Sequence, residues 1–175
     1  MNNMTTRTFA KTNTGKLFVL EDAHAAFLSR HGAILLNSNC DVIDFFAVKD
    51  GDASKHFETN IKNLESINNA QNRLMLPNGG FLMPSIIKTI IRSKDKPSVL
   101  IIGINEKVLY GFDDNEYSDL DGLFNAITDA LVAISSNKNS QVEWSAYTKI
   151  GTTQKTNSPV SAKKESETAP LAPAK

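Results

Sequence analysis

The stretch from Pro97 to Ile134 constrains the fold more than any other part of the chain. Val99 to Ile104 is an unbroken apolar run of strand length, which predicts a strand buried on both faces. Asn105 and Glu106 interrupt the run, so Lys107 to Phe112 is expected to return as its antiparallel partner. A chain containing such a hairpin needs further elements to cover it.

A helix is expected directly after this hairpin. Ser118 is the expected N-cap, and Asp119 and Asp121 fall in the first turn, where the helix dipole favours negative charge. Apolar residues at helical spacing predict a buried stripe on this helix. The stripe consists of Leu120, Leu123, Phe124, Ile127, Leu131 and Ile134.

The same order of elements occurs earlier in the chain. Residues 33–36 and 42–48 are expected strands, and residues 53–67 follow as a helix with Asp52 or Ser54 as its cap. Each half therefore reads as strand, turn, strand and helix. One interpretation is an internal duplication of residues 33–67 and 98–134.

The remaining elements are predicted from their local patterns. Asn78-Gly79 predicts a hairpin turn between apolar pairs, because glycine adopts positive φ at no cost. The full set comprises a strand at 16–20, a helix at 21–30, the hairpin of 74–76 with 81–83, a strand at 85–93 and an edge strand at 141–150 that includes Trp144.

These elements predict an α+β fold with a largely antiparallel sheet. The sheet is built from two strand-turn-strand-helix units, with the helices on one face. Residues 1–15 are expected to form a flexible arm, 16–150 a single domain, and 151–175 a disordered tail rich in Thr, Ser, Lys and Pro.

Composition limits the class of protein. Hydrophobic residues make up 41% of the 175 residues, enough for a core, and the formal net charge is zero, which argues against a duplex-DNA binder. No apolar run approaches the roughly 20 residues that span a bilayer, and no secretory signal precedes the domain. We therefore expect a small cytoplasmic protein that binds no membrane and carries no cofactor.

An enzyme is the least favoured class. The single cysteine, Cys40, lacks the flanking signature of known cysteine hydrolases, and His24, His31 and His56 are scattered. A hydrolase using Cys40 and a histidine, oriented by Asp44 or Asp22, is thus a distant alternative. No glycine-rich phosphate loop occurs.

Two charged stretches are candidates for binding. The acidic loop with Asp113, Asp114 and Glu116 is a weak candidate for a hard cation, since its spacing is not that of an EF-hand. A basic run could contact phosphate or an acidic partner, with Phe81 or Tyr110 as a stacking ring. The basic candidates are Lys88, Arg92, Lys94, Lys96 and Lys107.

We therefore expect a non-catalytic interaction or oligomerisation module that binds itself or another protein. Its basic run and acidic loop could meet between neighbouring subunits, with Trp144 as an aromatic anchor on the edge strand. The alternative is an accessory protein that binds single-stranded nucleic acid through the basic run.

Overall fold

The computed structural model describes residues 7–12, 14–65 and 72–150, and these form an α+β fold of antiparallel strands and two α-helices. The expected fold class is therefore confirmed. The helices are α1 (Ala53–Glu65) and α2 (Leu120–Ser135). The strands are β1 (Phe9–Lys11), β2 (Leu17–Val19), β3 (Ala25–Ser29), β4 (Gly32–Leu36), β5 (Val42–Ala47), β6 (Leu74–Met75), β7 (Phe81–Leu82), β8 (Ile87–Ser93), β9 (Ser98–Gly103) and β10 (Val108–Asp113).

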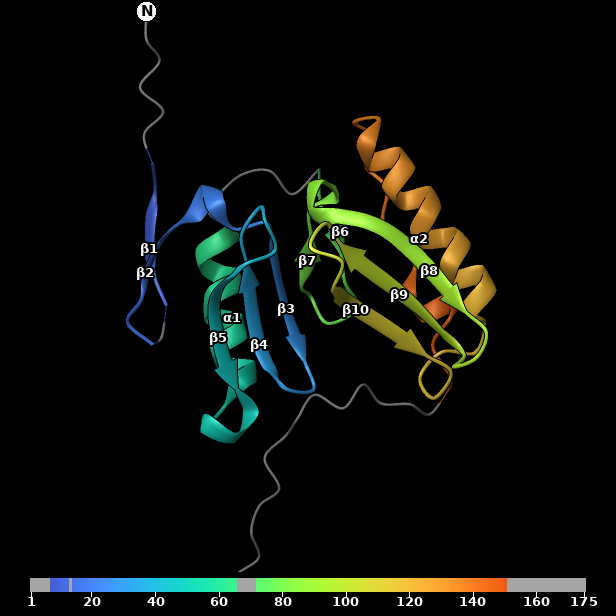
Figure 1. The fold of residues 1–175 in the computed structure, drawn as a ribbon, viewed down its shortest axis with the longest axis horizontal. Helices are drawn as coiled ribbons and strands as arrows, with labels where there is room; N and C mark the ends of the chain where they lie inside the picture. Colours follow the sequence, from blue (N-terminus) through green and yellow to red (C-terminus); the bar gives the residue numbers. More distant parts are fainter. Residues whose placement is uncertain (1–6, 13, 66–71, 151–175) are drawn as a thin grey trace, which may run out of the picture.

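The strands form two larger sheets and a separate hairpin (Figure 1). The first sheet has the order β5-β4-β3-β7-β6, and the second has the order β10-β9-β8. The hairpin of β1 and β2 stands apart from both. All described pairings are antiparallel. Most of them join strands that follow each other in the sequence, and the short β6–β7 hairpin is attached to the first sheet through the pairing of β7 with β3.

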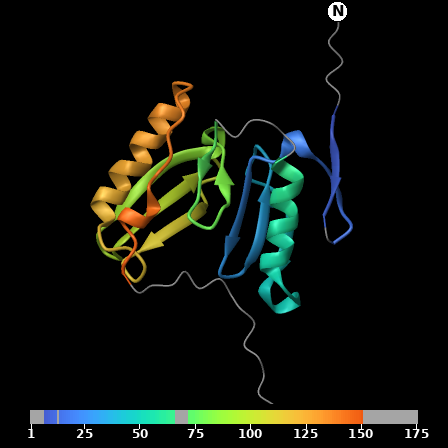
Figure 2. The ribbon, with the colours of Figure 1, turned by 180° about the vertical axis from the view of Figure 1, so that it is seen from behind.

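Two successive parts of the chain share one order of elements. The meander β3-β4-β5 leads into α1, and the meander β8-β9-β10 leads into α2. Viewed from behind, each helix lies in front of the strands of its own sheet (Figure 2). Each of these parts has three strands before its helix, whereas the segments 33–67 and 98–134 of the expected duplication contain two; residues 66 and 67 lie outside the described part. The duplication itself stays a prediction.

The main core lies where the two sheets and α2 meet. Val99 and Ile101 of β9 are fully buried there, together with Leu123 and Ile127 of α2. The first sheet contributes Phe27, whose ring meets that of Tyr110 edge-on at 5.8 Å between centroids. A second cluster, which includes Leu35 and Leu64, fills the space between the first sheet and α1.

The expected helix at 21–30 is wrong. Residues 20–22 form a single 3-10 turn, and Ala25–Ser29 is the central strand β3, paired with both β4 and β7. The local spacing of Ala and Phe suits a helix, but burial on both faces and hydrogen bonding on both edges favour the strand. The tertiary pairing therefore overrides the helical pattern of this segment.

The expected edge strand at 141–150 is also wrong. Trp144–Ala146 is a 3-10 turn, and the Trp144 ring stacks on Phe112 with 5.2 Å between centroids. The N-cap of α2 is Asp119 rather than Ser118, because the Asp119 carboxylate accepts from the Gly122 N–H at 2.8 Å. Ser118 instead donates to the Tyr147 carbonyl at 3.1 Å, tying this segment to the start of the helix.

The expected arm at 1–15 contains strand β1 within its described part, and the expected tail at 151–175 lies outside the described residues. The predicted β6–β7 hairpin is confirmed, with Gly79 at φ +80° in its turn. Neither α-helix of the described ranges is long and apolar enough to cross a membrane.

The packing of α2 predicts a large effect for one substitution. Leu123 is fully buried, so Leu123→Ala is expected to lower the free energy of unfolding by about 3 kcal/mol through lost contacts and a cavity. Val132→Ala, at a site 63% exposed on the same helix, is the matched control and should change it by less than about 0.5 kcal/mol. Equal effects in urea denaturation would contradict this packing.

Candidate functional site

The second sheet has two different faces, which the strand register defines. Direct partners across the strands point to the same side. The row of Ile90, Ile101 and Tyr110 faces inward to the main core, as does the row of Arg92, Val99 and Phe112. The alternate rows face outward. We call their central residues the outer face: Thr89, Ile91, Leu100, Ile102, Val108 and Gly111.

The outer face is aliphatic and uncovered within the described part of the chain. Ile91 is 45% exposed and Val108 is 55% exposed, while Leu100 and Ile102 belong to neither core cluster. Figure 1 shows α2 on the far side of this sheet, so the helix covers only the inward face. The expectation that 99–104 is buried on both faces is therefore wrong.

No side chain of the outer face is charged, but its two ends carry charges. Lys107 lies in the turn before β10, and Asp113 ends the same strand on the outward side. Ser93 and Ser98 share the row of Asp113. The result is an apolar surface on a small sheet, bounded at each end by polar groups.

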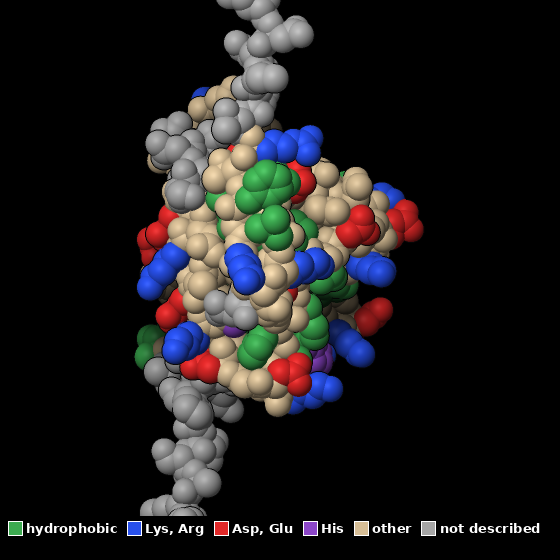
Figure 3. Space-filling model, turned by 90° about the vertical axis from the view of Figure 1, so that its left-hand side faces the viewer, with side chains coloured by type: hydrophobic (Ala, Val, Ile, Leu, Met, Phe, Trp, Pro, Cys, Tyr) green, Lys and Arg blue, Asp and Glu red, His purple; other side chains and the backbone are tan. Residues whose placement is uncertain are grey.

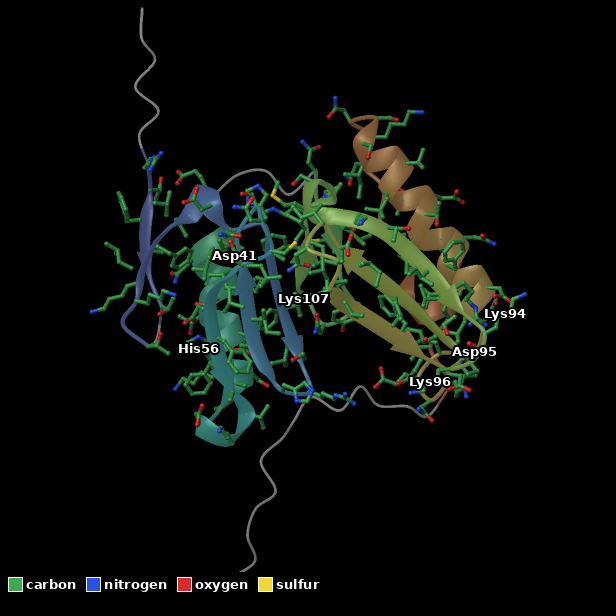
Figure 4. The ribbon with its side chains drawn as sticks, in the orientation of Figure 1. Asp41, His56, Lys94, Asp95, Lys96 and Lys107 are labelled. Atoms are coloured by element: carbon green, nitrogen blue, oxygen red, sulfur yellow. The ribbon has the colours of Figure 1, made fainter. Side chains whose placement is uncertain are left out.

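The basic run does not form one surface. Lys88 makes an ion pair with Glu106, and the Arg92 Nε donates to the Asp121 carboxylate at 2.7 Å. Lys94 and Lys96 lie in the turn at one end of the second sheet, and Lys107 lies at the other end (Figure 4). The length of the sheet separates Lys94 and Lys96 from Lys107, so these cations do not form one continuous basic surface for a phosphate backbone.

The acidic loop is largely used for local structure. The Asp113 carboxylate accepts from the Asn115 N–H at 2.9 Å, which closes a turn. Asp114 and Glu116 are exposed beside it. Among the residues that the structure describes, no cluster of three His, Cys, Asp or Glu side chains is arranged to hold a metal ion.

Both candidate stacking rings face the interior. Phe81 is 2% exposed, with the Arg73 guanidinium 4.2 Å from its centroid. Tyr110 packs between Phe27 and Phe112, and burial raises its pKa to about 12, with a smaller contribution from Glu116. Neither ring is open to an unpaired base.

Cys40 is not paired with a histidine among the described residues: His24 Nδ1 lies 3.0 Å from the Asp22 carbonyl oxygen, and His31 Nε2 accepts from Arg30 Nε at 3.0 Å. Cys40 is buried in the main core, with its Sγ 3.6 Å from the Ile86 carbonyl oxygen. An added Cβ at Gly103 would lie 3.0 Å from this sulfur, so the glycine permits the close approach. His56 lies on the α1 side of the first sheet and pairs with Asp44 instead.

Asp44 and His56 form a buried polar pair. The sequence named both residues only as possible partners of Cys40 and did not predict that they contact each other. Asp44 and His56 are 5% and 2% exposed, and His56 Nε2 donates to the Asp44 carboxylate at 2.6 Å. Thr14 donates to the other carboxylate oxygen at 3.1 Å, and Asn60 lies at 3.4 Å. Phe46 stacks on the imidazole at 4.6 Å. The cluster ties β5, α1 and the β1–β2 hairpin together.

One sequence signal does point to this cluster. Asp44 is the only charged residue in the apolar strand 42–47, and a carboxylate inside a core strand requires a partner.

The surface on this side of the molecule is mixed in charge. Figure 3 shows acidic, basic and apolar side chains interspersed there, with no patch of a single sign among the described residues.

Comparisons with protein-family models, curated proteins and solved structures find no match to this chain. The site must therefore be interpreted from its own geometry. Of its features, the outer face is accessible, whereas the Asp44–His56 pair and Cys40 are enclosed.

The buried carboxylate predicts a stability effect. Asp44→Ala leaves His56 Nε2 and the Thr14 hydroxyl without their acceptor, which should cost about 2 to 3 kcal/mol of unfolding free energy. Asp129→Ala, which removes an exposed carboxylate from α2, is the control. A change at Asp44 no larger than the control in urea denaturation would contradict a stabilising role.

The buried tyrosine predicts a loss of stability at alkaline pH. The pKa of Tyr110 is about 12 in the folded chain but about 10 when unfolded, so between these values only the unfolded state loses the proton. Its contribution is full below about pH 10 and declines as the pH rises above that value. Denaturation at rising pH should show this decline, and Tyr110→Phe should reduce its slope. An unchanged slope would contradict the assignment.

Proposed function

We propose that this chain is a non-catalytic interaction module whose contact surface is the outer face of the second sheet. The observation that supports this most is the exposure of Ile91 and Val108 on a sheet face that no described element covers. Exposed contiguous apolar surface is costly in water and is typical of binding surfaces. Binding a protein would remove it from water.

Binding of single-stranded nucleic acid has less support. Such sites combine a basic groove with exposed aromatic rings on which bases stack. In this chain the outer face has no ring, Phe81 and Tyr110 are turned inward, and the cations Lys94 and Lys107 lie at opposite ends. A hydrolase has less support still, because Cys40 and His56 lie in different layers.

The experiment compares two variants in their ability to retain partners. Ile91→Lys with Val108→Lys places two charges on the outer face, and Val132→Lys places one on the exposed side of α2 as a control. Partners that bind the wild type and the control should be lost by the double variant, because a buried unpaired lysine is costly. Circular dichroism checks that each variant is folded.

Hydrogen exchange of the purified complex then locates the contact. Binding should slow exchange in β8, β9 and β10 while leaving α1 unchanged. Partners that remain bound to the double variant, or protection confined to other elements, would contradict the proposed surface.

A further inference from the structure

We infer that Asn78 is a site of spontaneous deamidation, and that the folded β6–β7 hairpin holds it in the unreacted form. The site lies in the first sheet and does not depend on the proposed interaction surface. Asn78-Gly79 is the one asparagine–glycine pair in the 175 residues. Glycine has no side chain to hinder approach to its backbone nitrogen, so an asparagine before glycine is the one that reacts most readily with its own backbone.

The reaction needs only water as a co-reactant. The backbone nitrogen of Gly79 attacks the side-chain carbonyl carbon of Asn78, a new C–N bond forms, and the bond from that carbon to Nδ2 breaks. Ammonia leaves and takes up the proton of the Gly79 nitrogen. The cyclic imide that results then adds water. Opening on one side gives aspartate, and opening on the other side gives isoaspartate, in which the backbone runs through the former side chain.

Both reacting nitrogens are engaged in the folded hairpin. The Gly79 N–H donates to the Leu76 carbonyl at 3.0 Å, and Asn78 Nδ2, the leaving nitrogen, donates to the Leu28 carbonyl at 2.8 Å. The Gly80 N–H donates to Asn78 Oδ1 at 3.1 Å and so fixes the other side of the carboxamide. For the attack, the carboxamide must turn away from Leu28, and the Gly79 nitrogen must leave its own bond. The reaction therefore proceeds from an open hairpin, at a rate set by how often the hairpin opens.

The hairpin is built to open locally. Asn78 is half-buried and Gly79 is exposed at the tip, and β6 and β7 pair through only two residues each. The Gln141 side chain holds β6, the edge strand of the first sheet, from outside. Its Oε1 accepts from the Met75 N–H at 3.1 Å, and its Nε2 donates to the Arg73 carbonyl at 3.0 Å. These two bonds therefore oppose the opening that exposes Asn78.

The products cannot restore the native contacts. A carboxylate in place of the carboxamide has no proton to donate to the Leu28 carbonyl, so two oxygens face each other. Isoaspartate also lengthens the backbone by one methylene group just before Gly79 and Gly80. Gly80 packs tightly, since a Cβ there would lie 2.6 Å from the Ala26 carbonyl oxygen. Reaction at Asn78 is thus a one-way loosening of the pairing between β7 and β3.

Peptide mapping of the full chain measures the reaction directly. Trypsin cleaves after lysine and arginine and releases residues 74–88, in which Asn78 is the only asparagine or glutamine. The mass change from amide to acid in this peptide therefore reports Asn78 alone. The internal reference is Asn139, which is exposed and precedes Ser140 in the tryptic peptide 139–149, where fragment spectra locate the change. The chain is incubated at mildly alkaline pH, in buffer and in denaturing urea.

The fold should slow the reaction at one position only. In urea, Asn78 should react faster than Asn139, because a glycine follows it. In buffer, Asn78 should react about tenfold more slowly than in urea or slower still, whereas the exposed Asn139 should change little.

A variant outside the reacting pair tests the role of opening. Gln141→Ala removes the two bonds to the edge of β6 and should speed the reaction of Asn78 in buffer by about threefold or more. Asn125→Ala, at an exposed position of α2, is the matched control and should leave the rate unchanged. Circular dichroism checks that both variants are folded.

A further variant supplies the aspartate product without the reaction. Asn78→Asp should lower the melting temperature by about 3 °C or more and reduce the hydrogen-exchange protection of β6 and β7, because the bond to Leu28 is lost. Asn115→Asp makes the same chemical change at an exposed position of the acidic loop and serves as the control.

Each arm has a result that would overturn the inference. Asn78 reacting more slowly than Asn139 in urea rules out its assignment as the reactive site, and equal rates for Asn78 in buffer and urea rule out control by the fold. A folded Gln141→Ala chain that reacts no faster rules out opening of the hairpin as the controlling step. An Asn78→Asp chain as stable as Asn115→Asp rules out the loosening.

Discussion

The burial of Val99 and Ile101 on a single face of β9 is the constraint on which the rest of this structure depends. These two fully buried side chains lie where α2, the second sheet and the first sheet meet. Because side chains alternate along a strand, fixing one face of β9 inward turns Leu100 and Ile102 outward. The same alternation in the neighbouring strands turns Ile91 and Val108 outward with them.

The two three-stranded units differ in what covers them. The sheet containing β3, β4 and β5 has α1 on one face and the main core on the other, through residues such as Phe27. The sheet containing β8, β9 and β10 has α2 and that same core on one face, and no described cover on the other. The two units have the same order of strands and helix, but only the second has a sheet face without a described cover. That face is the proposed interaction surface.

Each ion pair among the described residues joins two neighbouring segments of the fold. Arg92 contacts Asp121 at the start of α2, and Asp44 holds His56 beneath the β1–β2 hairpin. Exposed pairs such as Lys88 with Glu106 add little, because water screens them. Enclosure of the Asp44–His56 pair makes it expensive to break, yet it also keeps the pair away from any substrate, which fits a structural role.

The sequence alone determined the α+β class, the β6–β7 hairpin, both helices and the strands β8 to β10, because their periodicity and turn residues are local properties. Its candidates for function, Lys107 for contact with phosphate or a partner and Asp113 for a cation, stay predictions. Only the tertiary structure decided that Ala25–Ser29 is a strand, since its pairing with β4 and β7 involves distant residues. It also decided which face of β9 is buried: both faces are apolar, so no local pattern distinguishes them, and the choice depends on where α2 and the first sheet pack.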